Sequence, residues 1–361
     1  MPAVSVVIDT YNHAGFIEEA VVSVLDQDFP AAETEILVVD DGSTDATAEI
    51  VKKFGSRLRY LPKKNGGQAS AFNFIAPETR GNIVAFLDGD DWWKKSKLSS
   101  IVEAFESHPA VGVVGHGIIQ VDSGTGQGSV LTPEHPGSFD LATPKGAQTF
   151  RNYMCFLGTS RVSIRRETLM KTLPIPEELV IEADEFMSVM SVAHGGALLL
   201  DEPLTYYRLH DQNLYQFRDK DHRRMRRKYL VLACLVKELP ARLRSAGIAA
   251  DAIEIIVAPI RVSATRMKLA LDGGWPWETY RAEKSDLDLA YRHTGLGYRA
   301  YKELSLLATL LLPPRLFYRM RDWYSEKDLR RFRRWLGDPV PAAPVNEKPF
   351  TSVPRTPGSA A

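Results

Sequence analysis

Three carboxylates lie close together directly after a short apolar segment. Asp88, Asp90 and Asp91 follow the run 83–87, and Gly89 separates the first two acids. Five consecutive apolar residues are typical of a strand buried on both faces of a parallel sheet. Such a strand delivers the acids to the carboxyl edge of the sheet, where open α/β sheets bind their ligands.

Acids at this spacing repel one another unless a cation lies among them. Carboxylate oxygens with no Cys or His beside them favour Mg²⁺ or Mn²⁺. The alternative is a solvated acidic turn that caps a helix beginning near Lys94. The preceding chain must decide between a metal site and such a turn.

The elements before this segment predict a parallel α/β sheet. Strands are expected at 4–8, 35–39 and 58–61, with helices at 16–25, 45–54 and 68–75 between them. Alternation of this kind implies right-handed crossovers between parallel strands. Nucleotides commonly bind such sheets, but the glycine-rich phosphate motifs are missing. A metal held by carboxylates can replace them, so the pattern favours the metal site.

Composition narrows the function classes. The 361 residues include 45 basic and 45 acidic side chains, which argues against a dedicated nucleic-acid binder. Cys155 and Cys234 support neither a disulfide framework nor a zinc site. With no signal-peptide pattern and no run of about 18 apolar residues, we expect a cytoplasmic protein that does not span a bilayer. His13, His116 and His194 are isolated in sequence and are expected to be satisfied or solvent-exposed.

Three regions are expected along the chain. Residues 1–217 form the α/β catalytic domain, 218–337 a helical C-terminal appendage, and 338–361 a disordered tail rich in Pro, Ala and Ser. Basic and aromatic residues interleave over 301–336, a pattern that suits peripheral contact with the inner face of the cell membrane. Packing against the catalytic domain, or against a second subunit in a homo-oligomer, is the alternative.

Six segments together resemble the family-2 glycosyltransferases of the GT-A fold. They are SVVIDTYN (5–12), ILVVDDGSTD (36–45), NGGQASAFN (65–73), GNIVAFLDGDDWW (81–93), EADEF (182–186) and YYRLHDQN (206–213). The resemblance covers about the first 215 residues. It implies a Rossmann-like, mostly parallel sheet flanked by helices, and an inverting enzyme that uses a nucleotide-sugar donor and Mg²⁺ or Mn²⁺.

The resemblance also assigns site residues. Thr10 and Tyr11 would flank the nucleotide base, Asp41 would accept a hydrogen bond from uracil N3–H, and Asn12 would help to fix the loop. Asp88 and Asp90 would meet ribose and metal, with Asp90 or Asp91 as the direct ligand and His210 at the diphosphate or metal. The remaining residues expected in the donor site are Asn73, Gly89 and Trp92. Trp92 offers a flat face for sugar stacking, or else anchors the core.

Asp184 resembles the family's catalytic base. The motif commonly reads Glu-Asp, whereas here Ala183 precedes Asp184 and Glu185 follows, so Glu185 is the alternative. Asp184 is preferred because the stripe of Phe186, Val189, Met190 and Ala193 leaves it free to point into a cleft. One base without a second carboxylate nucleophile predicts inversion.

The expected function is therefore transfer of a sugar, from a UDP-sugar in particular, to a hydroxyl of a saccharide or lipid-linked acceptor. Polysaccharide, lipopolysaccharide or glycolipid assembly at a bacterial surface is the expected context, and no nucleic-acid partner is expected. The alternatives are a polyprenyl-phosphate glycosyltransferase and a catalytically inactive nucleotide-sugar-binding partner.

Overall fold

The computed structural model describes residues 2–210, 222–290, 296–311 and 345–350. These divide into two compact units. The first contains the described residues up to 140, those of 153–210, and 345–350; the second contains 141–152 and the described residues of 222–311. Within the described ranges, none of the helices combines the length and apolar character needed to cross a membrane.

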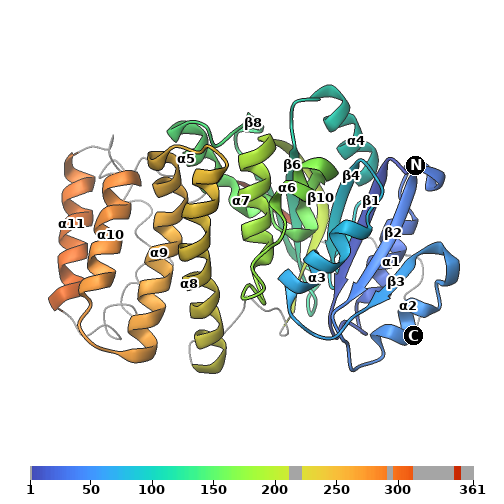
Figure 1. The fold of residues 1–361 in the computed structure, drawn as a ribbon, viewed down its shortest axis with the longest axis horizontal. Helices are drawn as coiled ribbons and strands as arrows, with labels where there is room; N and C mark the ends of the chain where they lie inside the picture. Colours follow the sequence, from blue (N-terminus) through green and yellow to red (C-terminus); the bar gives the residue numbers. More distant parts are fainter. Residues whose placement is uncertain (1, 211–221, 291–295, 312–344, 351–361) are drawn as a thin grey trace. The chain divides into compact units, whose positions relative to one another are not determined.

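The first unit is built on one mixed sheet (Figure 1). Its strands are β1 (Val4–Thr10), β2 (Thr34–Asp40), β3 (Arg59–Pro62), β4 (Ile83–Asp88), β5 (Trp92–Trp93), β6 (Val113–Asp122), β7 (Gly128–Pro133), β8 (Gly137–Phe139), β9 (Ser163–Arg165), β10 (Ala197–Leu209) and β11 (Val345–Phe350). The main path runs β11-β7-β6-β9-β4-β1-β2-β3. β3, β2, β1 and β4 are mutually parallel, and β10 lies parallel to β6. The expected α/β class is confirmed.

Helices cover both faces of this sheet. They are α1 (Ile17–Leu25), α2 (Thr47–Lys52), α3 (Gln68–Ile75), α4 (Lys97–Ser107), α6 (Arg166–Thr172) and α7 (Ala183–Gly195), with short 3₁₀ turns η1 (Ala31–Glu33), η2 (Gly55–Arg57), η3 (Ala76–Glu78), η4 (Met154–Phe156) and η5 (Thr159–Arg161). α1, α2 and α4 pack on one face of β1, β2 and β4 in a single hydrophobic cluster. α3 packs on the other face, where the rings of Phe72 and Phe86 lie 5.4 Å apart. The buried side of α1 repeats every three or four residues, as its sequence pattern predicts.

Three segments form strands that local patterns do not specify. The stretch 122–146, rich in Gly, Pro, Ser and Thr, contains β7, which pairs antiparallel with β6, and β8, which pairs antiparallel with β10. β10 continues past Pro203 to Leu209 by shifting its register against β6 around that proline. In the expected disordered tail, Val345–Phe350 form β11, antiparallel to β7; the rest of 338–361 lies outside the described residues.

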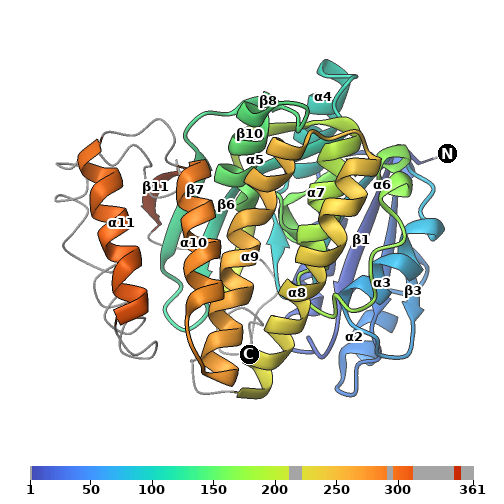
Figure 2. The ribbon, with the colours of Figure 1, turned by 60° about the vertical axis from the view of Figure 1, so that its left-hand side comes forward.

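The second unit is helical. Its helices are α5 (Pro144–Tyr153, its last residue in the first unit), α8 (His222–Ser245), α9 (Ala250–Asp272), α10 (Trp277–Ala290) and α11 (Leu296–Leu311). Figure 2 shows α8, α9 and α10 side by side. Arg151 of α5 makes a two-pronged ion pair with Asp286 of α10, with N–O distances of 2.6 and 3.0 Å.

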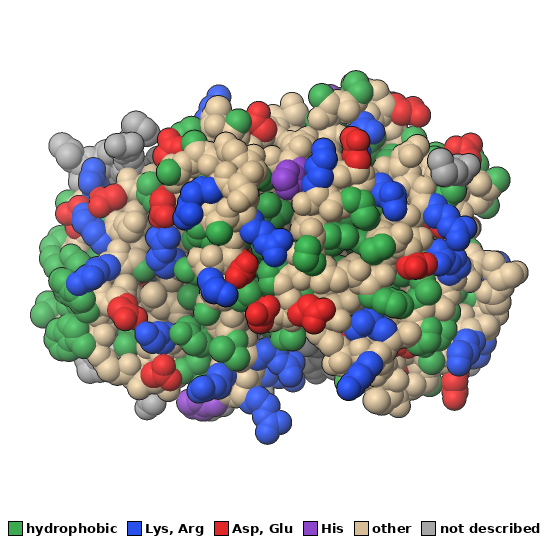
Figure 3. Space-filling view, in the orientation of Figure 1, with side chains coloured by type: hydrophobic (Ala, Val, Ile, Leu, Met, Phe, Trp, Pro, Cys, Tyr) green, Lys and Arg blue, Asp and Glu red, His purple; other side chains and the backbone are tan. Residues whose placement is uncertain are grey.

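This unit exposes large apolar side chains. Trp275 is 72% exposed, and Leu304 and Leu311 of α11 are 68% and 82% exposed. Figure 3 shows hydrophobic side chains gathered at the left-hand edge, where Figure 1 has α11. Part of the segment 301–336 expected to contact a membrane, residues 312–336, lies outside the described residues.

Candidate active site

The sheet brings the ends of β1 and β4 to one edge. Their parallel register places Asp9 opposite Asp88, and the N–H of Gly89 donates to the carbonyl of Asp9 over 2.8 Å. A Cβ at Gly89 would lie 2.7 Å from Oγ1 of Thr10 and 2.8 Å from Nδ1 of His13. Glycine is therefore required at this position by close approach of the loop after β1.

Asp90 lies between two histidines. Its Oδ2 is 3.0 Å from Nε2 of His210 and 3.9 Å from Nε2 of His13. The ring of Phe16 covers His210, with centroids 4.6 Å apart. Burial alone would raise the pKa of Asp90, but the hydrogen bond from His210 and the charge of His13 outweigh it, so its pKa lies below the usual value. Asp90 is consequently the ionised member of the acidic group.

The pKa values of the neighbouring acids shift in the opposite direction. Burial, followed by the charges of Asp90 and Asp91, raises the pKa of Asp88 well above its usual value. Burial and then Asp90 raise the pKa of Asp91 to about 7. Burial and then Asp41 raise the pKa of Asp9 to about 8. Ionisation of further acids beside Asp90 is therefore unfavourable at this edge, and a bound cation would relieve that penalty.

A divalent cation fits this donor set. Among the described residues no three His, Cys, Asp or Glu side chains are arranged as a ready ligand set. Asp90 and His210 are already in contact, however, and Mg²⁺ in phosphate-transfer sites is commonly bound by one or two carboxylates, with phosphate and water completing the shell. We therefore take Asp90 and His210 as the residues that would hold the ion.

Asp91 faces the protein interior. It is 1% exposed, and its Oδ1 accepts the backbone N–H of Arg208 over 2.9 Å. The guanidinium of Arg208 in turn donates to the carbonyl of Asp90 over 2.7 Å and pairs with Glu19 of α1. These contacts join the end of β10 to the acidic turn. Asp91 therefore positions the turn through this contact with β10.

Trp92 is packed on both sides. It is 4% exposed, its ring stacks on Tyr206 at 4.9 Å with 6° between the planes, and Arg208 lies 4.3 Å from its centroid. Such burial matches the core-anchor interpretation and leaves little ring surface for a sugar.

Asp41 binds the loop that follows β3. It is 4% exposed, pairs with Nζ of Lys63 at 2.6 Å, and accepts the N–H groups of Gly66 and Gly67 at 3.0 and 2.7 Å. Gly67 has φ of 86°, and a Cβ there would lie 2.6 Å from Cα of Val180. The Asn-Gly-Gly segment therefore wraps around the carboxylate that the resemblance assigns to the base.

The loop after β1 combines fixed and exposed groups. Thr10 is 1% exposed, and its Oγ1 lies 3.3 Å from Nδ1 of His13. Asn12 adopts φ of 57°. Its Oδ1 accepts the N–H of Thr44 over 2.8 Å, and its own N–H donates to Oγ of Ser43 over 2.9 Å. Tyr11, between them, is 46% exposed. A rigid loop thus presents an exposed aromatic ring.

Asp184 lies in the first turn of α7. Its Oδ2 accepts the N–H of Thr159 over 3.2 Å and its Oδ1 accepts the N–H of Glu185 over 3.0 Å. The next residue of η5, Ser160, uses its hydroxyl to accept the N–H of Asp88 at 3.0 Å and to donate to Oδ2 of Asp88 at 3.2 Å. Consecutive residues of one turn thus hold the acid of β4 and the candidate base.

Asn73 is used inside the fold. Its amide donates to the carbonyl of Ile175 and accepts the N–H of the same residue, each over 2.8 Å. It was expected in the donor site, but the structure gives both polar ends of its side chain to this backbone.

Sequence patterns did not identify Arg208, Ser160 or the approach of His13 to Asp90. Arg208 lies inside the YYRLHDQN segment, which was a usable signal, whereas Ser160 lies in a stretch without any recognisable motif. His13 stands alone in sequence and meets Asp90 only because the loop after β1 folds over Gly89.

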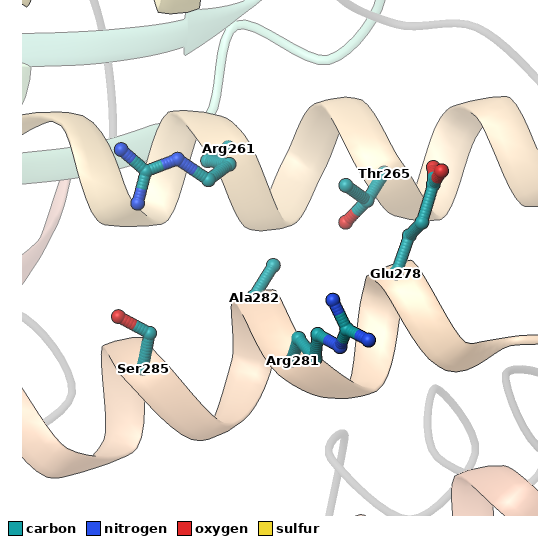
Figure 4. Close-up of a pocket in the computed structure, with 6 residues that line it drawn as sticks. All are labelled: Arg261, Thr265, Glu278, Arg281, Ala282 and Ser285. Atoms are coloured by element: carbon teal, nitrogen blue, oxygen red, sulfur yellow. The ribbon is translucent and has the colours of Figure 1, made fainter.

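A hollow in the second unit lies between α9 and α10 (Figure 4). It is lined by Arg261, Thr265, Glu278, Arg281, Ala282 and Ser285. Arg261 already pairs with Glu254 at 2.9 Å, and Arg281 lies 5.2 Å from the ring centroid of Trp277. With its guanidinium groups engaged in this way, the hollow offers no acid–base pair comparable to that at the sheet edge.

Comparison with known proteins places a family match on the first half of the chain. Residues 5–168 match the family described as glycosyl transferase family 2. An uncharacterized glycosyltransferase of Nostoc sp. is 37% identical over 221 residues, which are 58% of this chain and 66% of that protein. The poly(ribitol-phosphate) β-N-acetylglucosaminyltransferase TarS of Staphylococcus aureus is 29% identical over 209 residues, 56% of this chain and 35% of TarS. The chain therefore spans less than two thirds of the length of these relatives.

A crystal structure of S. aureus TarS 1-349 in complex with UDP-GlcNAc is similar in fold. The TM-score is 0.52 at 20% sequence identity, and the match covers 84% of this chain and 91% of that one. At this identity the likeness supports the GT-A architecture of the sheet and its helices.

Proposed function

We propose that this chain, whose residues 5–168 match glycosyl transferase family 2, is an inverting enzyme of that family that moves a sugar from a nucleotide-sugar donor to an acceptor hydroxyl. The observation that carries this proposal is the turn η5. Thr159 binds Asp184 and Ser160 binds Asp88, so the acid that would bind the donor and the carboxylate that would act as general base are held by consecutive residues. Direct displacement at an anomeric carbon needs such a pair of groups.

The donor would lie across the carboxyl ends of β1 and β4. The exposed ring of Tyr11 would stack on the base, and the buried carboxylate of Asp41 would read its edge after its contact with Lys63 or the glycine amides loosens. Asp88 would bind the ribose, and Asp90 with His210 would face the diphosphate.

Asp184 would accept the proton of the acceptor hydroxyl as that oxygen attacks the anomeric carbon. The carbon–oxygen bond to the nucleoside diphosphate breaks on the opposite side, so the configuration inverts. When bound at Asp90 and His210, a divalent cation supplies Lewis-acid stabilisation of the charge on the leaving diphosphate. The N–H groups of Thr159 and Glu185 hold the carboxylate of Asp184 oriented for this transfer.

UDP-GlcNAc is the first donor to test. TarS, a relative over 56% of this chain, is named as a β-N-acetylglucosaminyltransferase and has been crystallised with this compound. The acceptor that we propose is a hydroxyl of a saccharide or lipid-linked polymer in bacterial surface polysaccharide, lipopolysaccharide or glycolipid assembly.

We also propose that the enzyme works in the cytoplasm at the inner face of the membrane. Support comes from the exposed Trp275, Leu304 and Leu311 of the helical unit and from the basic and aromatic composition of 301–336. Co-sedimentation with anionic phosphatidylglycerol vesicles tests this membrane contact. If the protein self-associates and does not bind the vesicles, the exposed apolar surface of the helical unit belongs to a homo-oligomer.

The decisive experiment is a thermal-shift screen of UDP-, GDP- and dTDP-sugars with and without Mn²⁺, followed by a nucleotide-release assay. We expect one UDP-sugar to raise the melting temperature in a concentration-dependent way, and more so with Mn²⁺. Binding without any nucleotide release would indicate an inactive binding partner. Preference for GDP- or dTDP-sugars would contradict the role of Asp41.

A further inference from the structure

Lys97 is a lysine with no exposed surface and no carboxylate partner among the described residues. It is 0% exposed at the start of α4, and its Nζ lies 2.8 Å from Nε2 of His116 and 2.9 Å from the carbonyl of Ser160. Burying an amine without a neighbouring acid costs free energy unless each of its N–H donors makes a hydrogen bond. This arrangement therefore needs an explanation beyond helix packing.

The hydrogen bonds around Lys97 fix the direction of each donor. His116 directs Nδ1 to the carbonyl of Gly117 at 2.7 Å, so Nδ1 carries the proton and Nε2 accepts from Lys97. A third contact joins Nζ to Oγ1 of Thr205 at 3.5 Å. Burial, and then Arg161, lowers the pKa of Lys97 well below its usual value.

Three donors converge on one carbonyl. The carbonyl oxygen of Ser160 accepts from Oγ1 of Thr205 at 2.6 Å, from Nζ of Lys97 at 2.9 Å and from Nε1 of Trp93 at 3.3 Å. β5 and α4 are neighbours in sequence, whereas β10, which supplies Thr205, lies 108 residues beyond Lys97. Ser160 is consequently held more tightly than hydrogen bonding of a 3₁₀ turn alone would require.

The held turn carries the two groups of the proposed chemistry. The hydroxyl of Ser160 binds the N–H and Oδ2 of Asp88, and the N–H of Thr159 binds Oδ2 of Asp184. Gln68 adds a second link, since it binds Oγ1 of Thr159 through Nε2 at 3.2 Å and accepts the N–H of Ala183 at 2.9 Å. Movement of η5 would therefore displace both carboxylates together.

We infer that Lys97 and Thr205 are positioning residues: by fixing the carbonyl of Ser160 they hold η5, and through η5 the spacing between Asp88 and Asp184. This inference rests on the proposed function. Displacement of reacting groups by about 1 Å can lower the rate on the order of a hundredfold. Loss of Lys97 or Thr205 should therefore lower kcat more than it lowers the stability of the fold.

The test compares Lys97→Met, Ser160→Ala and their double variant in nucleotide release from UDP-GlcNAc. We expect each single change to lower kcat by about tenfold to a hundredfold, and the double variant to be little worse than either. Thr205→Val should lower kcat as well, while Thr205→Ser, which retains the hydroxyl, should restore it. Multiplicative effects in the double variant would overturn the inference.

Two controls separate position from stability. Lys95→Met removes an exposed lysine two residues away and should leave kcat unchanged. Ile101→Ala removes a buried side chain from the same helix and should lower the melting temperature while kcat is retained. Ile101→Ala shows how much activity a given loss of melting temperature costs. If Lys97→Met lost no more activity than that relation predicts, the inference would be wrong. If Lys97→Met does not fold, the comparison of Thr205→Val with Thr205→Ser decides.

A crystal structure of Lys97→Met, or of Thr205→Val, distinguishes this inference from the proposed function. We expect Ser160 to move and its hydroxyl to leave Asp88. An unmoved η5 would overturn the inference even in an active enzyme, whereas a wild-type protein that releases no nucleotide from any donor would overturn the proposed function and leave this geometric readout intact.

Discussion

Oδ2 of Asp90 and Nε2 of His210 lie 3.0 Å apart although 120 residues separate them in sequence. The contact joins the end of β4 to the end of β10, and Arg208 supports it by binding the carbonyl of Asp90. A carboxylate and an imidazole at this distance either share a hydrogen bond or bind one cation between them. The proposed donor site depends on the second state.

Removing the metal should therefore abolish activity. Excess EDTA should stop nucleotide release, and Mn²⁺ or Mg²⁺ should restore it. Asp90→Asn and His210→Ala should each raise the Mn²⁺ concentration needed for half-maximal activity by at least roughly ten- to a hundredfold. Mutation of residues that only support metal ligands typically lowers metal affinity by that factor. His108→Ala, at the end of α4, is the matched control and should leave the titration unchanged. Full activity in EDTA would exclude a metal-dependent mechanism.

The choice of base can be tested at two neighbouring acids. Asp184→Asn should lower kcat by about 10²- to 10⁴-fold while the affinity for the nucleotide sugar is retained, because the base acts only on the acceptor. Glu185→Gln should be far milder. Initial rates of nucleotide release and calorimetric donor binding measure the two effects. The opposite ranking would make Glu185 the base, and a mild Asp184→Asn would favour a polyprenyl-phosphate acceptor, which needs no deprotonation.

The strands that position the donor site could be predicted from sequence. Val4–Thr10 and Ile83–Asp88 contain continuous apolar runs, and a buried parallel strand is the structure that such runs form. Acids that follow these runs must meet at one sheet edge, as the pairing of Asp9 with Asp88 demonstrates. The general location of the site therefore followed from local patterns.

Contacts between distant segments could not be predicted in this way. Trp92 and Trp93 form a two-residue strand because Thr205 and Tyr206 pair with them, and nothing local to the tryptophans encodes that partner. Lys97 shows the same limit, because the contacts that allow its burial come from residues 116, 160 and 205. Local sequence would assign a lysine at a helix start to solvent.

Stability should depend on pH through Glu185. Burial, and then Asp184, raises the pKa of Glu185 from 4.5 to about 7, so the folded protein binds this proton more tightly than the unfolded chain. Its stabilising contribution is complete below pH 4.5 and is lost as the pH rises through about 7. Melting temperatures of Glu185→Gln and wild type should therefore be similar below pH 4.5, diverge as the pH rises from 4.5 to about 7, and keep a constant difference above that, with the variant more stable.

The exposed Glu178 supplies the control for this titration. Glu178→Gln should follow the wild-type melting temperature across the whole range. A difference between Glu185→Gln and wild type that is independent of pH would mean that Glu185 ionises normally in the folded protein.

The adjacent lysines Lys63 and Lys64 provide a final comparison. Lys63 pairs with the buried carboxylate of Asp41 at 2.6 Å, whereas the side chain of Lys64 is exposed. Lys63→Met leaves Asp41 with the two glycine N–H groups and no cation, so we expect a loss of about 1–3 kcal/mol in the free energy of unfolding. Lys64→Met should change it by less than about 0.5 kcal/mol.

Donor binding should separate the same two variants, because the Asn-Gly-Gly loop is held by the carboxylate that Lys63 neutralises. Urea unfolding gives the stability difference, and titration with UDP gives the affinity. If Asp41 reads the base, Lys63→Met should change UDP affinity and Lys64→Met should not. Equal UDP affinity in both variants, together with an intact stability difference, would restrict Asp41 to holding the loop and assign base recognition to Tyr11 and its neighbours.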